Sequence, residues 1–172
     1  MYTMKKLLFI AIFASITFTS QAQTEFSIVA GFSNSSEQDD FVNQGFGTGG
    51  GYYVGLGAEL PLTKGSSIYS EFTYGNINAT NYIQLPVLYK YNFTNNVSVL
   101  AGPQLGFVYI TNRDDISSFS IGLGAAIRYD FSDKFYAITR YNFQLNEHTS
   151  NRFPDANYRV NVANVGFGYK LF

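Results

Sequence analysis

The chain of 172 residues contains no cysteine and no tryptophan, and it has a single histidine. The lack of cysteine excludes disulfide bonds and thiolate metal sites, and it leaves the redox compartment undetermined. Charged residues make up only 13% of the chain, about half of the ~25% that is usual in soluble domains. The formal net charge is −1 and no basic patch is present, so we predict no nucleic-acid partner.

Long apolar runs are also missing after the first 22 residues. The apolar stretch 7–18 follows two lysines and precedes a Ser-Gln-Ala sequence, whose small residues fit the −3 and −1 positions of a cleavage site. This stretch is shorter than the ~20 apolar residues that a transmembrane helix needs. We therefore predict a signal peptide over residues 1–22, removed after export through the Sec pathway, and a mature domain over residues 23–172. A membrane location of that domain requires strands closed into a barrel.

What the chain does contain is aromatic residues, 14 tyrosines and 17 phenylalanines, and long apolar alternation. The alternation is clearest in residues 82–93 and 97–109, on either side of a Thr-Asn-Asn turn. One face of this hairpin is apolar and uncharged: Ile83, Leu85, Val87, Tyr89, Tyr91, Phe93, Val97, Val99, Ala101, Pro103, Leu105, Phe107 and Tyr109. The other face is mostly small or polar. This pattern exceeds the ~5–6 residues of an average strand and is typical of strands with lipid outside and a polar lumen inside.

The same alternation predicts eight strands in all, over residues 25–33, 52–60, 67–74, 82–93, 97–109, 119–131, 135–145 and 158–172. The connections are alternately longer (34–51, 75–81, 110–118 and 146–157) and shorter (61–66, 94–96 and 132–134). An even strand number with long outer loops and short periplasmic turns is typical of outer-membrane barrels. We predict an all-β fold, an eight-stranded antiparallel up-and-down transmembrane β-barrel. The alternative is a soluble lipocalin-type barrel, which the many glycines on the polar face disfavour.

Three positions interrupt the regular pattern. Pro86 and Pro103 lie within predicted strands, where each forfeits a ladder hydrogen bond, so we expect a local bend or bulge there. In the last strand the apolar residues change parity upstream of residue 165, which suggests a bulge near Ala163.

Charged side chains with inward parity form the candidate site: Glu59, Glu71, Lys90, Arg128, Asp130 and Arg140. Three acids and three bases make the set formally neutral. Eight strands enclose room only for side chains, so we predict a structural ion-pair plug in which Arg128 or Arg140 pairs with Glu71 or Glu59. The alternative is a gate or solute site in a narrow channel.

Catalytic chemistry has one candidate. His148 and Ser150 have the His-x-Ser-Asn spacing of outer-membrane lipid A deacylases, but residues 160–165 lack the carboxylate that follows in that family. A polar loop that happens to hold one histidine is the favoured interpretation. The pairs Asp39-Asp40 and Asp114-Asp115 are interpreted as solvated loop charges rather than cation ligands. We predict a protein that is not an enzyme, with no catalytic residues, cofactor or metal.

Four strand sequences resemble a known family: YIQLPVLYKYNF, VLAGPQLGF, TRYNFQL and the closing VGFGYKLF. They look like the PorT-like outer-membrane β-barrel family of Gram-negative bacteria, whose small barrels resemble the OmpA membrane domain, and the resemblance covers residues 23–172. It implies an outer-membrane location, contact with lipid and lipopolysaccharide, and assembly by the barrel assembly machinery, which reads a terminal aromatic such as Phe172. It also implies an envelope, adhesin-like, secretion-associated or transport-associated role. The shared motifs are strand patterns and carry no catalytic residues.

Overall fold

The computed structural model describes residues 24–39, 49–77, 80–110, 119–146, 148–149 and 157–171. Its strands are β1 (Glu25–Asp39), β2 (Gly49–Thr63), β3 (Ser66–Ile77), β4 (Thr80–Asn92), β5 (Val97–Ile110), β6 (Phe119–Asp130), β7 (Phe135–Gln144), β8 (His148–Thr149) and β9 (Asn157–Lys170). Within the described residues, no helix is long and apolar enough to cross a membrane.

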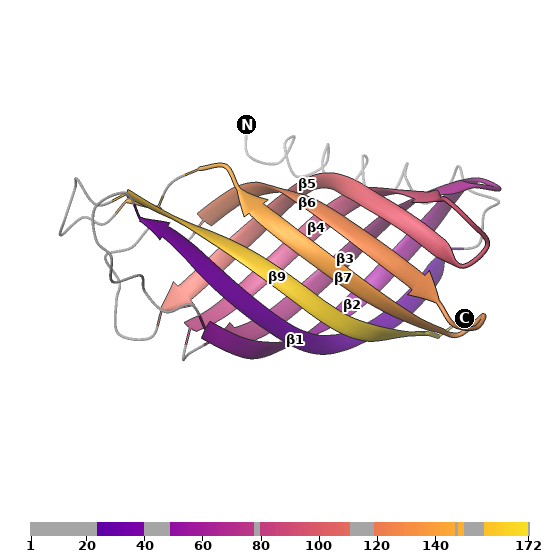
Figure 1. The fold of residues 1–172 in the computed structure, drawn as a ribbon, viewed down its shortest axis with the longest axis horizontal. Coiled ribbons are helices and arrows are strands. Elements are labelled where there is room, and N and C mark those ends of the chain that lie inside the picture. Colours follow the sequence, from indigo (N-terminus) through magenta and orange to yellow (C-terminus); the bar gives the residue numbers. More distant parts are fainter. Residues whose placement is uncertain are drawn as a thin grey trace, which may run out of the picture.

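The eight long strands form a closed antiparallel barrel (Figure 1). Strands β1 to β7 pair in chain order, and β9 pairs with β7. The pairing of β9 with β1 closes the sheet. The two-residue strand β8 extends this sheet by pairing with the start of β9. The predicted eight-stranded up-and-down barrel is therefore confirmed.

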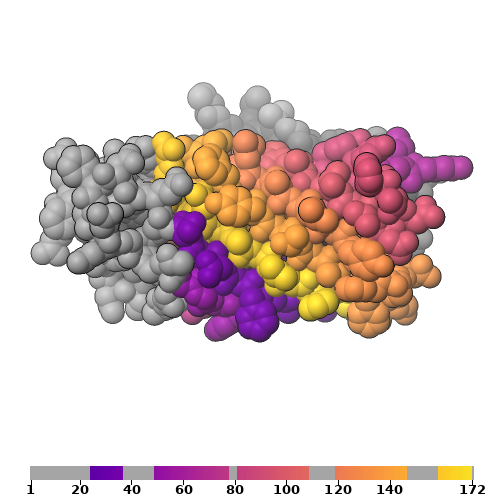
Figure 2. Space-filling model, viewed as in Figure 1, coloured from indigo at the N-terminus to yellow at the C-terminus, as the bar shows by residue number. Residues whose placement is uncertain are grey.

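The register of the strands fixes the width of the barrel. Following paired residues once around the barrel from Val99 leads back to Tyr109 on the same strand, ten residues further along. An offset of ten residues over eight strands corresponds to a strand tilt of about 40° and a barrel radius of about 8 Å. The tilt is visible as diagonal bands of side chains in Figure 2. A barrel this narrow holds side chains and no wide pore.

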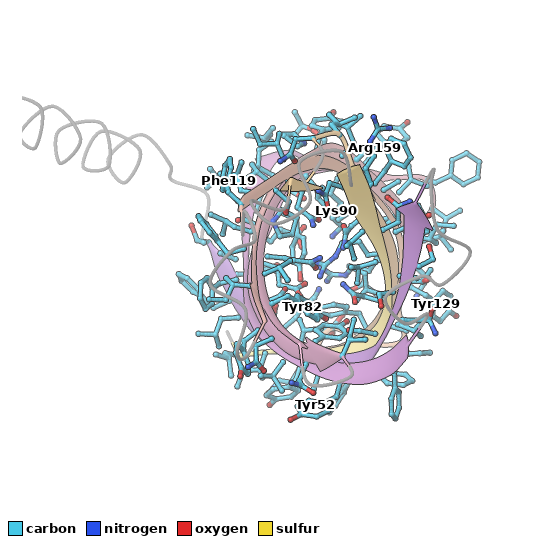
Figure 3. All side chains as sticks on the ribbon, turned by 90° about the vertical axis from the view of Figure 1, so that its left-hand side faces the viewer. Tyr52, Tyr82, Lys90, Phe119, Tyr129 and Arg159 are labelled. Atoms are coloured by element: carbon cyan, nitrogen blue, oxygen red, sulfur yellow. The ribbon has the colours of Figure 1, made fainter. Side chains whose placement is uncertain are left out.

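Side chains alternate between the two faces of the barrel wall as the sequence predicts. In the central hairpin Tyr82, Leu88 and Lys90 are buried. Most of the predicted apolar set is exposed on the outer face: Leu85, Val87, Tyr89, Tyr91, Phe93, Val99, Leu105 and Phe107. Figure 3 shows Tyr82 and Lys90 pointing into the interior and Tyr52, Phe119 and Tyr129 pointing away from it. The large exposed apolar surface faces lipid in a barrel of this kind.

Aromatic rings gather toward both ends of the outer face. Near the short turns, Tyr129 lies 5.1 Å from Phe131, and Phe131 lies 6.2 Å from Phe167, measured between ring centroids. Near the other end, Phe107 and Phe119 are 5.2 Å apart. Clusters of rings at the two ends of the outer face are typical of the interfacial girdles of outer-membrane barrels.

Several strands are longer than the apolar pattern predicts. β1 continues to Asp39, β2 begins at Gly49, and the predicted loop 75–81 is largely strand, because β3 ends at Ile77 and β4 begins at Thr80. Apolar alternation marks only the part of a strand that faces lipid. Beyond it the backbone ladder continues with polar residues on both faces, so the predicted strand ends were wrong there.

The bulge expected near Ala163 is absent. β9 keeps one register with β1 from Lys170 to Tyr158, and Val162 is buried inside the barrel within an apolar cluster. The change of parity therefore reflects an apolar side chain on the inner face. A register shift occurs instead between Pro61 and Thr63.

Neither mid-strand proline produces a bulge. The β3–β4 ladder loses pairs between Ser70 and Thr73, opposite Pro86, and resumes in the same register. The β4–β5 ladder likewise keeps its register across Pro103. The Ser70 hydroxyl donates to the Pro86 carbonyl at 3.0 Å, which replaces part of the interrupted ladder.

Candidate functional site in the barrel lumen

The six charged residues singled out in the sequence all lie on the inner face of the barrel, in two groups. The first group lies toward the short turns and the second lies deeper in the lumen. The turn-end group consists of Glu59, Lys90, Arg128 and Asp130. The deeper group consists of Glu71 and Arg140. Their positions follow from the period of two along β2, β3, β4, β6 and β7.

In the turn-end group, the Glu59 carboxylate is the shared acceptor. It accepts hydrogen bonds from Lys90 Nζ at 2.7 Å, from Arg128 Nη1 at 2.9 Å and from the Ser67 hydroxyl at 2.7 Å. Arg128 also donates through Nη2 to Asp130 Oδ1 at 2.7 Å. One guanidinium thus joins two carboxylates from β2 and β6, which ties opposite parts of the wall together.

Lys170 belongs to this group but was not among the residues proposed from sequence. Its Nζ lies 3.2 Å from Asp130 Oδ1 and 3.5 Å from Glu25 Oε2. The parity of the last strand, which places Val165, Phe167 and Tyr169 outward, was the signal that could have identified it.

Outside the turn-end group the lumen opens into a vestibule of about 330 Å³ at the end with the short turns. Its lining is polar and includes Glu25, Lys64, Asp133 and Lys170 around the Glu59–Lys90 pair.

Arg128 is held from the other side by a tyrosine ring. Its Cζ lies 3.7 Å from the centroid of Tyr136, whose hydroxyl is 2.9 Å from the Ser27 hydroxyl and 3.2 Å from that of Tyr69. The Tyr136 ring occupies the place of a side chain at Gly168, where a Cβ would lie 2.1 Å from the ring. Gly168 is thus required for the ring to lie flat against the wall beneath the guanidinium.

The deeper group is a fully buried ion pair. Arg140 Nη1 lies 3.1 Å from Glu71 Oε2, and the two side chains are 1% and 0% exposed. Glu71 also accepts hydrogen bonds from the hydroxyl of Tyr69 at 2.7 Å and from that of Thr73 at 2.8 Å. Arg140 Nη2 donates to Thr73 Oγ1 at 3.3 Å. The desolvated charges therefore have each other and two hydroxyls as partners, as a stable buried pair requires.

An uncharged polar layer follows toward the loop end. Gln84 Oε1 accepts from Asn142 Nδ2 at 3.1 Å and from Asn164 Nδ2 at 3.3 Å, and Ser33 donates to Asn164 Oδ1 at 2.7 Å. Ser33 also bonds the hydroxyl of Tyr82. Beyond this layer Ile77 and Val162 are buried with Val108 and Val160 packed nearby. The lumen is thus filled by charged, amide and apolar side chains in succession.

The other candidate residues fall largely outside the described structure. Ser150 is not described, and for His148 the structure gives only the backbone pairing with Tyr158. The aspartate pairs 39–40 and 114–115 and the segment 1–22 have no described side chains. Among the residues that are described, no three His, Cys, Asp or Glu side chains gather in a way that could hold a metal ion.

Comparison with known proteins places this geometry in context. The family model described as "Outer membrane protein beta-barrel domain" matches residues 7–170, without distinguishing PorT-like members. Among solved structures, Ail, the attachment invasion locus protein of Yersinia pestis, is similar with a TM-score of 0.55 and 16% identity, over 87% of this chain and 99% of that one. No curated protein matches the chain.

Two further structures show the same architecture. A de novo designed transmembrane β-barrel has a TM-score of 0.52 and 13% identity, over 88% of this chain and 98% of that one. The outer membrane protein AlkL has a TM-score of 0.50 and 11% identity, over 89% and 92%. At these identities the likeness concerns the fold alone, and a fold does not determine an activity.

Proposed function

Because the chain belongs to the outer-membrane β-barrel protein family, we propose that it serves the envelope as a closed barrel without enzymatic activity, whose lumen does not conduct ions. The observation that carries this proposal is the Arg140–Glu71 pair, with side chains 1% and 0% exposed in a barrel of about 8 Å radius. The surrounding medium is outer-membrane lipid and lipopolysaccharide.

The order of the side-chain layers along the lumen supports a plug. An ion that enters from the vestibule meets the Glu59–Lys90–Arg128 group first, then the Arg140–Glu71 pair, and then uncharged amides and apolar side chains. Passage requires separation of buried ion pairs and transfer of a charge through the apolar layer. Both steps carry a large desolvation cost.

With the lumen closed, a role in secretion, transport or adhesion has to be exercised at the outer surface or at the ends of the barrel. We keep these roles as alternatives within the proposal. Pull-down of the intact protein from outer membranes would identify its protein partner and so distinguish these roles.

Biogenesis forms part of the proposal. Residues 1–22 act as a Sec signal peptide, residues 23–172 form the mature barrel, and the barrel assembly machinery inserts it into the outer membrane. Mass spectrometry of the protein isolated from outer membranes should give the mass of a chain that begins at Gln23. A mass that includes residues 1–22 would contradict cleavage.

Planar bilayer recording tests the closed lumen. The wild-type protein should show no steady conductance, and Glu71→Gln should introduce transient openings because it removes one partner of the deep pair. Lys64→Gln, at an exposed position of the vestibule rim, is the matched control and should remain silent. A steady wild-type conductance that Glu71→Gln leaves unchanged would favour the channel alternative.

The hydrolase alternative has its own test. Lipid A from cells that express the wild-type protein should carry the same acyl chains as lipid A from cells that express Ser150→Ala. Loss of an acyl chain that depends on Ser150 would assign the protein to lipid modification.

A further inference from the structure

Two buried amide oxygens on the inner wall lack hydrogen-bond partners. They are Gln104 Oε1 and Asn142 Oδ1, on residues that are 6% and 4% exposed. Both border the same point, since a Cβ built on Gly124 would lie 3.3 Å from the Asn142 oxygen and 3.6 Å from the Gln104 oxygen. The sequence shows Gly124 only as a small inward residue between Leu123 and Ala125.

Three adjacent strands build this point. Gly124 on β6 pairs with Asn142 on β7 and, on its other side, with Gly102 on β5. Gln104 is the next inward-facing residue of β5 after Gly102. The Leu88 side chain closes it from the next strand, with Cδ2 at 3.1 Å from the Cβ position. The backbone of Gly124 lies outside the left-handed region, so its conformation does not require glycine. A Cβ here would crowd Leu88 Cδ2 and the Asn142 oxygen, so glycine keeps the two amide oxygens uncovered on this side.

The chemistry of the two oxygens defines the ligand. An amide oxygen only accepts hydrogen bonds, so the ligand has to donate two of them. A water molecule does so and is the usual occupant of a small internal site with polar partners. A monovalent cation is disfavoured because Arg140, two residues along β7 from Asn142, carries a buried charge, and its Nε also lacks a hydrogen-bond partner.

We propose that Gly124, Gln104 and Asn142 form an internal binding site for one structural water molecule within the amide layer of the lumen. A single enclosed water bridges β5 to β7 and provides no continuous path for ions, so the site is compatible with the plug and independent of it.

Two substitutions at Gly124 separate this proposal from simple crowding. Gly124→Ala fills the space and leaves both oxygens without a donor, whereas Gly124→Ser fills it with a hydroxyl that donates to one of them. We expect the thermal unfolding midpoint in detergent to fall more for alanine than for serine. Gly50, where a Cβ meets nothing within 4 Å, is the control position, and its alanine and serine variants should behave alike. If serine at position 124 is as harmful as alanine or worse, crowding alone explains the site and the proposal fails.

Direct detection uses the wild-type protein and does not depend on the variants folding. NMR in lipid bilayers should show magnetisation transfer between long-lived water and the side-chain amides of Asn142 or Gln104, and Gly124→Ser should abolish it. Absence of such transfer in the wild type would overturn the proposal. A wild-type midpoint that rises when sodium replaces choline at constant ionic strength would also overturn it, in favour of a bound cation.

Discussion

At the scale of single residues, substitution of Glu71 is expected to have the largest effect on stability. It is 0% exposed and accepts hydrogen bonds from Tyr69 and Thr73 beside its pair with Arg140. Glu71→Gln leaves the Arg140 charge buried without a counter-charge, which typically costs about 3–5 kcal/mol. We expect a lower unfolding midpoint in a denaturant titration in lipid vesicles, with membrane insertion intact.

Lys64→Gln is the matched control for this neutralisation. Lys64 is exposed in the turn between β2 and β3, so its removal should change the free energy of unfolding by less than about 0.5 kcal/mol. Equal stability of Glu71→Gln and the wild type would show that the buried pair does not stabilise the barrel.

Adjacent residues on one strand test the two faces of the wall. Leu123 is 51% exposed on the outer face, and Gly124 is buried on the inner face. Leu123→Arg directs a cation toward the bilayer and should cost about 2–4 kcal/mol if it lies near mid-membrane. Gly124→Ser should cost much less. The measurement is the free energy of unfolding for both variants, and equal losses would mean that the assigned faces are wrong.

At the scale of elements, the end of β7 is completed by amide side chains. Asn146 Oδ1 accepts from the Ile121 amide at 2.6 Å, and its Nδ2 donates to the Phe119 carbonyl at 3.0 Å, so one side chain imitates a paired backbone residue. On the other edge, Gln144 Oε1 accepts from the Val160 amide at 3.2 Å. These bonds continue the ladders of β6 and β9 beyond the last residue of β7.

Asn146→Ala should therefore loosen β6 locally. Loss of one hydrogen bond is worth about 0.5–1.5 kcal/mol, so we expect the Ile121 amide to exchange its hydrogen about two- to tenfold faster, as measured by NMR. Asn34→Ala, at an exposed asparagine of β1, is the control and should leave this rate unchanged. An unchanged rate in Asn146→Ala would mean that the side-chain amide does not protect the ladder.

At the scale of the whole molecule, closure of the sheet predicts resistance to detergent. With β1 paired to β9, the barrel has no free edge at which unfolding can begin. Unboiled protein should run faster than boiled protein in an SDS gel, and the band should come from the outer-membrane fraction. Recovery as a soluble periplasmic protein, or identical mobility before and after boiling, would contradict a closed membrane barrel.

The sequence by itself determined the number of long strands, the two faces of each strand except the start of the last one, and the inward position of residues such as Glu71 and Arg128. These features depend on a period of two, which is a local property of an extended chain. It also anticipated that an arginine would meet a glutamate, because an uncompensated charge is costly inside a narrow barrel.

Only the tertiary structure decided which partners meet and where the strands end. The offset of ten residues around the barrel sets Arg140 beside Glu71 and Arg128 beside Glu59, and this offset is the sum of eight pairings between distant segments. The inward direction of Val162 follows from the unbroken pairing of β9 with β1, and the two oxygens beside Gly124 meet through the pairing of β6 with β5 and β7. Register is a property of pairs of strands, so no single segment of the sequence contains it.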